Sequence, residues 1–121
     1  MCIRDRSRLG TTFVNAVELM LGCSGRVVVC GLGKTGHIAR KIAATLASTG
    51  TRSFFLHAAE AIHGDIGMLA QEDVLLTVSY SGEGHEILTI LPAAHRLGVK
   101  VIAMTGNPQS CLLYTSDAAD E

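Results

Sequence analysis

Tryptophan is absent from the 121 residues, and aromatic residues make up only 4% of them. The chain therefore has few side chains on which nucleic-acid bases could stack. Neither sign of charge is in excess, because the formal net charge is -1, so no nucleic-acid or anionic membrane partner is indicated. Apolar runs of the roughly 18 residues that span a bilayer are missing, as is the apolar core of a signal peptide. We expect a cytoplasmic protein.

Paired cysteines are also lacking. None of the four cysteines lies in a C-x-x-C pair, and no metal-ligand spacing occurs. Cys30 ends an apolar segment, where a buried, reduced thiol is expected. We therefore expect no cofactor.

Strand-like and helix-like segments alternate along the middle of the chain. Short apolar segments at 26–31, 52–56, 73–79 and 99–105 predict strands, and segments 9–21, 34–48 and 83–97 predict helices, with a short helix and turn at 58–68. In helix 34–48, Ile38, Ile42 and Leu46 recur every fourth residue. Together with the neighbouring Ala39, Ala43 and Ala47 they form one stripe of small and medium side chains that is predicted to pack on the sheet. This alternation predicts an α/β fold with a parallel, doubly wound sheet.

Ligands of such sheets bind beyond the carboxyl ends of the strands, so four loops matter most: 31–36, 57–65, 79–86 and 105–107. The first, GLGKTG, matches G-x-G-x-x-G, but His57 stands where a dinucleotide site needs an acidic residue. Val28 stands where a Walker A loop needs glycine. What remains is a glycine turn before a helix, where N–H groups and Lys34 favour an anion. The alternative is a tight turn with a solvated lysine.

The third loop, SYSGEG, offers the hydroxyls of Ser79 and Ser81 at the start of a helix, a pattern that suits a phosphate. Ser81 as an ordinary helix cap is the alternative. If the first and third strands are neighbours, both loops flank one cleft suited to a phosphorylated, polyhydroxylated small molecule. A lone histidine is usually structural, but His57 and His63 share one connection, which favours sugar contacts or metal binding.

Three segments together carry a family resemblance: GRVVVCGLGKTGHIARKIAATLASTGT, FFLHAAEAIHGDIGML and SYSGEGHEI. Across residues 25–110 the chain resembles the sugar-isomerase (SIS) domain of D-arabinose 5-phosphate isomerases. The resemblance implies a three-layer, flavodoxin-like sandwich. It also implies the interconversion of D-ribulose 5-phosphate and D-arabinose 5-phosphate, which supplies 3-deoxy-D-manno-octulosonate for lipopolysaccharide or capsule. The family tends to form homotetramers with sites shared between subunits.

The resemblance also implies roles for individual residues. Lys34 and Glu86 fall on catalytically important positions, and which of them moves the proton stays open. Substrate-binding roles fall on Gly50, Thr51, His57, His63, Ser79 and Ser81, and His57 also falls on a position linked to inhibitory zinc. The chain departs from the family at Gly84, where a serine or threonine usually stands, so one phosphate donor is expected to be lost.

The two ends do not continue the central pattern. We interpret residues 1–7 and 111–121 as artefacts translated from sequencing-adapter DNA, and residues 8–110 as a partial SIS domain. A domain that is incomplete at its C-terminus is expected to leave the fourth strand with an unpaired edge and to be inactive by itself. The alternative to an isomerase is the sugar-phosphate-binding SIS module of a transcription regulator.

Overall fold

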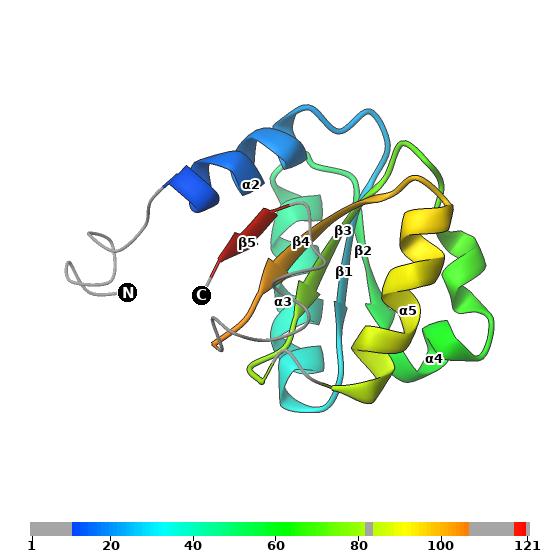
Figure 1. Cartoon of the computed structure of the whole chain (residues 1–121). Coiled ribbons are helices and arrows are strands. Elements are labelled where there is room, and N and C mark those ends of the chain that lie inside the picture. The colour runs from blue at the N-terminus through cyan, green and yellow to red at the C-terminus, as the bar shows by residue number, and fades with distance from the viewer. Residues whose placement is uncertain (1–10, 82–83, 107–117, 121) are drawn as a thin grey trace.

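Parallel strands form one twisted sheet in the computed structural model, which describes residues 11–81, 84–106 and 118–120 (Figure 1). The order across the sheet is β2-β1-β3-β4-β5, and every neighbouring pair is parallel. The strands are β1 (Val27–Gly31), β2 (Ser53–His57), β3 (Val74–Val78), β4 (Lys100–Met104) and β5 (Ala118–Asp120). The predicted parallel α/β fold is confirmed, and the first and third strands are indeed neighbours.

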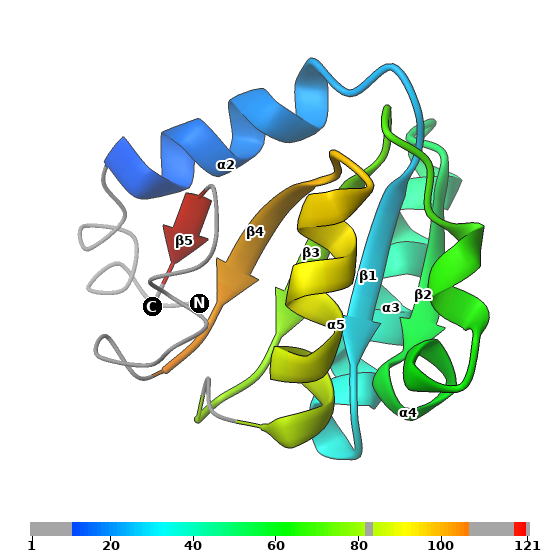
Figure 2. The same cartoon turned by 45° about the vertical axis from the view of Figure 1, so that its right-hand side comes forward.

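Helices cover both faces of this sheet, as Figure 2 shows. Successive side chains of a strand point to opposite faces. Val28 of β1 therefore lies in the core on the side of α4 and α5, whereas Val29 lies in the core on the side of α3. The helices are α2 (Thr11–Leu21), α3 (Lys34–Ser48), α4 (Ala58–Ile62) and α5 (His85–Arg96), with a 3₁₀ turn at Asp65–Met68. Burial on both faces explains why β1 and β3 are apolar throughout.

Helix α3 packs on the sheet through small residues. Its buried residues are Gly36, Ala39 and Ala43, which lie three and four positions apart on one stripe. Ile42 is partly buried, but Ile38 is 52% exposed, so the prediction that Ile38 faces the sheet was wrong. Small side chains let the helix backbone approach the strands closely, and this contact rotates Ile38 toward solvent.

The side of β4 that faces away from β3 was predicted to be an unpaired edge, and the structure differs. Ile102 and Met104 of β4 pair with Ala118 and Asp120 of β5, so the expectation of an unpaired edge at the fourth strand was wrong. Helix α2 contacts β5 and covers this end of the sheet. Residues 1–10 and 107–117 lie outside the described residues, and the interpretation of both chain ends as artefacts stays a prediction.

At the opposite edge lies β2, whose two phenylalanines each meet an arginine. The Arg26 guanidinium lies 4.7 Å from the centre of the Phe54 ring, and the Arg40 guanidinium lies 4.4 Å from that of Phe55. Because Phe54 and Phe55 point to opposite faces, one cation covers an aromatic ring on each face. The edge strand therefore presents charge beside its apolar side chains.

Asp73 organises the amino-terminal edge of the sheet, which we call the amino edge. Its carboxylate is 2% exposed and accepts hydrogen bonds from the N–H groups of Arg26 (2.8 Å) and Ala70 (2.9 Å). The Arg26 guanidinium lies 3.4 Å from the same carboxylate. A side chain at Gly25 would collide with an Asp73 oxygen, so the chain enters β1 through a tightly packed turn.

None of the helices among residues 11–81 and 84–106 is long and apolar enough to span a membrane.

Candidate active site

The loop after β1 turns sharply into α3. Gly33 has a φ of 62°, which favours glycine, and Lys34 begins the helix with an exposed side chain. The Thr35 hydroxyl donates to the Leu32 carbonyl oxygen (2.7 Å) and accepts from the Leu32 N–H (3.2 Å), which closes the turn from inside. An added Cβ at Gly31 would lie 2.6 Å from the Thr35 carbonyl oxygen. Gly31 and Gly33 are thus required by the turn that presents Lys34.

The loop after β2 is built around His57, the last residue of that strand. Its Nδ1 accepts a hydrogen bond from the Ala59 N–H (3.2 Å) and so caps α4. The ring stands edge-on to Phe55, with centroids 6.1 Å apart. Because Nδ1 is an acceptor here, the neutral ring carries its proton on Nε2. His57 therefore presents a hydrogen-bond donor outward, and exposed His63 ends the same short helix.

His57 in this arrangement does not fit the expected zinc site. Zinc binding through Nε2 would require the proton to move to Nδ1, where it would oppose the Ala59 N–H. No group of three His, Cys, Asp or Glu side chains with metal-binding geometry occurs among the described residues. The zinc role of His57 stays a prediction that this geometry does not favour.

The loop after β3 is tied to the end of β4. The Ser79 N–H donates to the carbonyl oxygen of Met104, the last residue of β4 (3.0 Å), which extends the ladder one residue beyond β3. The next carbonyl oxygen, that of Tyr80, accepts from the Thr105 hydroxyl (3.2 Å) and from the Gly106 N–H (2.9 Å). Sequence reasoning named loop 105–107 as a polar loop but gave it no role. In the structure, Thr105 and Gly106 of this loop hold the backbone of the serine loop at Tyr80.

Glu86 lies in the first turn of α5, half-buried, two residues after the N-cap. That N-cap is Gly84, which forms no side-chain cap hydrogen bond. The expected loss of one phosphate-donating hydroxyl at this position stays a prediction. Ser81, which is exposed, belongs to the loop after β3. The amino end of α5 follows that loop. Gly82 and Glu83 lie outside the described residues.

Strand pairing brings these loops to one edge of the sheet, which we call the carboxyl edge. Gly31 of β1 pairs with His57 of β2, and Cys30 of β1 pairs with Thr77 of β3. Lys34, His57 and Ser79 stand at or just beyond the ends of β1, β2 and β3, and Ser81 follows in the third loop. His63 follows α4, and Glu86 lies in the first turn of α5. The switch point lies between β1 and β3, where the crossovers leave in opposite directions.

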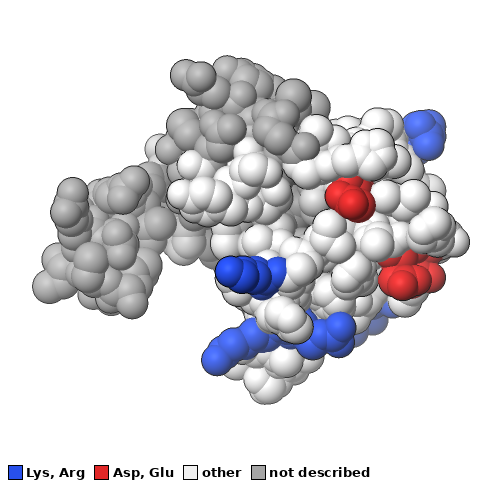
Figure 3. Space-filling view, turned by 90° about the horizontal axis from the view of Figure 1, so that it is seen from below, with Lys and Arg blue, Asp and Glu red and all other residues white. Residues whose placement is uncertain are grey.

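Figure 3 views the molecule from this edge: most of the basic side chains in view lie together, another lies apart at the upper right, and acidic side chains lie on the right. Helix α3 carries the exposed basic residues Lys34, Arg40 and Lys41. Beneath the edge, burial raises the pKa of the Cys30 thiol to about 12, so this cysteine stays protonated at neutral pH and is not a nucleophile. The prediction of a buried, reduced Cys30 is confirmed.

Two predicted site residues lie elsewhere. Gly50, with a φ of 101°, and Thr51 follow the last turn of α3, and the Thr51 N–H donates to the Leu46 carbonyl oxygen (2.9 Å). The helix carries the chain about 22 Å from its first residue, at 1.5 Å per residue. Gly50 and Thr51 therefore line a cavity of about 540 Å³ at the amino edge, with Arg26 and Ser53. The structure does not bring them to the carboxyl edge of their own chain.

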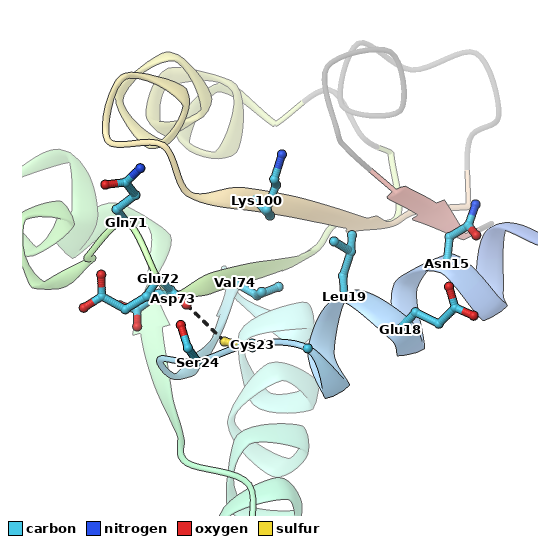
Figure 4. Close-up of a pocket in the computed structure, with 11 residues that line it drawn as sticks. Asn15, Glu18, Leu19, Cys23, Ser24, Gln71, Glu72, Asp73, Val74 and Lys100 are labelled. Carbon is cyan, nitrogen blue, oxygen red and sulfur yellow. Dashed lines mark hydrogen bonds between the residues drawn. The ribbon is translucent and has the colours of Figure 1, made fainter.

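A second cavity, of about 630 Å³, also opens at the amino edge, between α2 and the starts of β3 and β4 (Figure 4). Its walls include Glu18, Glu72 and Lys100, and the Cys23 thiol donates to the Glu72 carbonyl oxygen (3.3 Å). None of the predicted site residues lines this cavity. It is separate from the candidate active site.

Comparison with known proteins agrees with the α/β fold. The family described as SIS domain matches residues 20–119. Arabinose 5-phosphate isomerase KdsD of Pseudomonas aeruginosa is 59% identical over 111 residues, which are 92% of this chain and 34% of that protein. Arabinose 5-phosphate isomerase GutQ of Escherichia coli K12 is 54% identical over 105 residues, 87% of this chain and 33% of that protein. The chain thus spans about a third of the length of these curated relatives.

A solved structure is similar as well. The structure of c3406 from E. coli CFT073, which was solved in complex with a sugar phosphate, superposes with a TM-score of 0.89 at 47% sequence identity. The match covers 92% of this chain and 59% of that one. The likeness therefore extends to the sequence as well as to the fold.

Proposed function

Since the chain belongs to the SIS domain family, we propose that it is the sugar-phosphate-binding part of an arabinose 5-phosphate isomerase, which interconverts D-ribulose 5-phosphate and D-arabinose 5-phosphate. The observation that carries this proposal is the 59% identity with an arabinose 5-phosphate isomerase over 111 residues. The product would feed the synthesis of 3-deoxy-D-manno-octulosonate. The convergence of the loops after β1, β2 and β3 at one edge supports the same function.

The reaction moves a proton between C1 and C2 of the sugar through an enediol. It needs a base at those carbons and a positive group or donor beside the developing oxyanion. Glu86, half-buried in the first turn of α5, is suited to carry the proton. The Lys34 ammonium, at the start of α3, is suited to stabilise the oxyanion. Ser79 and Ser81 would hold the phosphate, while the Nε2–H of His57 would donate to a sugar hydroxyl.

The test is a turnover assay of the complete product of the gene that encodes this chain, with residues 1–121 assayed in parallel. D-Ribulose 5-phosphate is the substrate, and chromatography follows the formation of D-arabinose 5-phosphate. We expect turnover by the complete product and binding without turnover by residues 1–121. Absence of both turnover and sugar-phosphate binding in the complete product would overturn the proposal.

The separation of Gly50 and Thr51 from the carboxyl edge suggests how the site is completed. We also propose that the protein is a homo-oligomer in which the amino edge of one copy reaches the carboxyl edge of another. This arrangement reconciles the substrate-binding roles of Gly50 and Thr51 with their place about 22 Å along α3 from Lys34. It requires a second copy, because one rigid helix separates the two groups within a chain.

Complementation between two inactive variants measures this directly. Thr51→Trp and Lys34→Ala are each expected to be inactive alone. When they are co-expressed in mixed oligomers, activity is expected to return, because some sites then combine an intact Lys34 with an intact Thr51. If both residues served the site of their own chain, every site in the mixture would carry one defect. A mixture that stays inactive, although mixed oligomers are verified by affinity tags, would contradict the shared site.

A further inference from the structure

The carbonyl oxygen of Tyr80 accepts two hydrogen bonds from one short segment after β4. The donors are the Thr105 hydroxyl (3.2 Å) and the Gly106 N–H (2.9 Å). Thr105 is only 3% exposed, whereas the Tyr80 side chain is 81% exposed, so the buried partner holds the exposed one. We propose that Thr105 and Gly106, together called the Tyr80 clamp, are positioning residues that set the phosphate-binding geometry of segment 79–81. This inference rests on the proposed function.

The clamp fixes the direction of a peptide group. The peptide bond between Tyr80 and Ser81 is trans, so its N–H points away from its carbonyl group. The carbonyl group is directed at the segment after β4, and β3 lies between β4 and β1. The Ser81 N–H is therefore directed toward β1, where the GLGKTG turn and Lys34 lie. An anion at the switch point would meet this N–H together with the amino end of α3.

The Tyr80 ring adds a steric lock to the same peptide. A Cβ placed on Gly106 would lie 2.7 Å and 2.8 Å from two ring carbons, Cε2 and Cδ2, so the ring packs directly on the glycine backbone. A side chain at this position would push the exposed ring away from this contact.

A bond of the same kind inside the sheet provides a matched comparison. The Thr77 hydroxyl of β3 donates to the Ile102 carbonyl oxygen of β4 (3.1 Å), further inside the sheet than the clamp. Thr77 and Thr105 are both buried, and each joins the same two strands or their extensions, but only Thr105 holds the loop. Loss of the Thr77 bond should weaken the sheet without moving segment 79–81.

The experiment compares Thr105→Val with Thr105→Ser and Thr77→Val, in the complete gene product. Calorimetry measures the binding of D-arabinose 5-phosphate, of inorganic phosphate and of unphosphorylated D-arabinose. Thr105→Val is expected to raise the Kd for both phosphate-bearing ligands about fivefold, the effect of one lost neutral hydrogen bond. Thr105→Ser should restore the affinity, because it keeps the donor. Thr77→Val should lower the melting temperature as much as Thr105→Val does, while its Kd for both phosphate-bearing ligands stays unchanged. In turnover, Thr105→Val should raise KM and leave kcat nearly unaltered.

The outcomes separate this inference from the function on which it rests. If the unaltered protein binds no sugar phosphate, the proposed function fails, and the inference fails with it. If it binds, and Thr105→Val has an unaltered Kd or loses affinity no more than Thr77→Val, the inference alone is overturned. Should Thr105→Val not fold, Gly106→Pro removes the other donor to the Tyr80 carbonyl oxygen, at an exposed position. An unaltered phosphate Kd in that variant would also overturn the clamp.

Discussion

Replacing Lys34 by alanine is expected to lower the kcat of D-arabinose 5-phosphate formation about a thousandfold, because removing a charged group that acts on the transition state costs two to four orders of magnitude. Lys34 is exposed at the first position of α3, so its loss should leave the melting temperature nearly unchanged. Steady-state kinetics of the complete gene product, together with a thermal melt, measure both quantities.

The matched control is Lys41→Ala. Lys41 is exposed on the same helix, about two turns further from the carboxyl edge, and carries the same charge. It should leave kcat within a factor of about two, because screening weakens its field at the site. Equal effects of the two replacements would mean that Lys34 contributes only general charge, and the role proposed for it would then fall.

Asp73→Ala is expected to lower the free energy of unfolding by about 3 kcal/mol. The carboxylate is the acceptor for two backbone N–H groups, those of Arg26 and Ala70, and each loses its partner on replacement. The contact with the Arg26 guanidinium, whose side chain is 39% exposed, adds little because solvent screens it. Most of the effect therefore comes from the unsatisfied N–H groups rather than from the ion pair.

Urea denaturation followed by circular dichroism measures this loss. Asp73→Asn keeps one carbonyl oxygen and should lose about half as much, while Glu72→Ala, at the exposed neighbouring position, should change stability by less than about 0.5 kcal/mol. A loss below about 1 kcal/mol for Asp73→Ala would show that water replaces the carboxylate, and the amino edge would then not depend on it.

The fold was predictable where the apolar composition of a segment and the glycine turns at its ends indicate the same element. The run at β1 is apolar because both faces are covered, and helix α3 has its predicted bounds because glycine turns precede and follow it. Ile38 shows the limit of this reasoning. The predicted stripe contained Ile38 together with Ala39 and Ala43, but only the two alanines are buried against the sheet, because the close approach of helix and strands leaves no room for the larger side chain. Pairing of β4 with β5 was also missed, because segment 111–121 had been set aside.

The site was predictable only in part. The positions of Lys34 and Ser79 at the carboxyl edge were predictable, because each follows a strand and precedes a helix, which is a local pattern. The support of Tyr80 by Thr105 was not predictable, since the partners are 25 residues apart and meet only through the pairing of β3 with β4. The separation of Thr51 from Lys34 equally needed the length and direction of α3.

The placement of Arg26 and Arg40 over the rings of β2 also bears on self-association. Among the described residues, β2 has a neighbour on one side only, and its sequence SFFLH has the apolar, β-prone character of segments that seed fibrils. A strand added from another molecule would have to pass two guanidinium groups, one on each face, and would place like charges side by side. The arginines thus act as gatekeepers that keep this edge from propagating a cross-β stack.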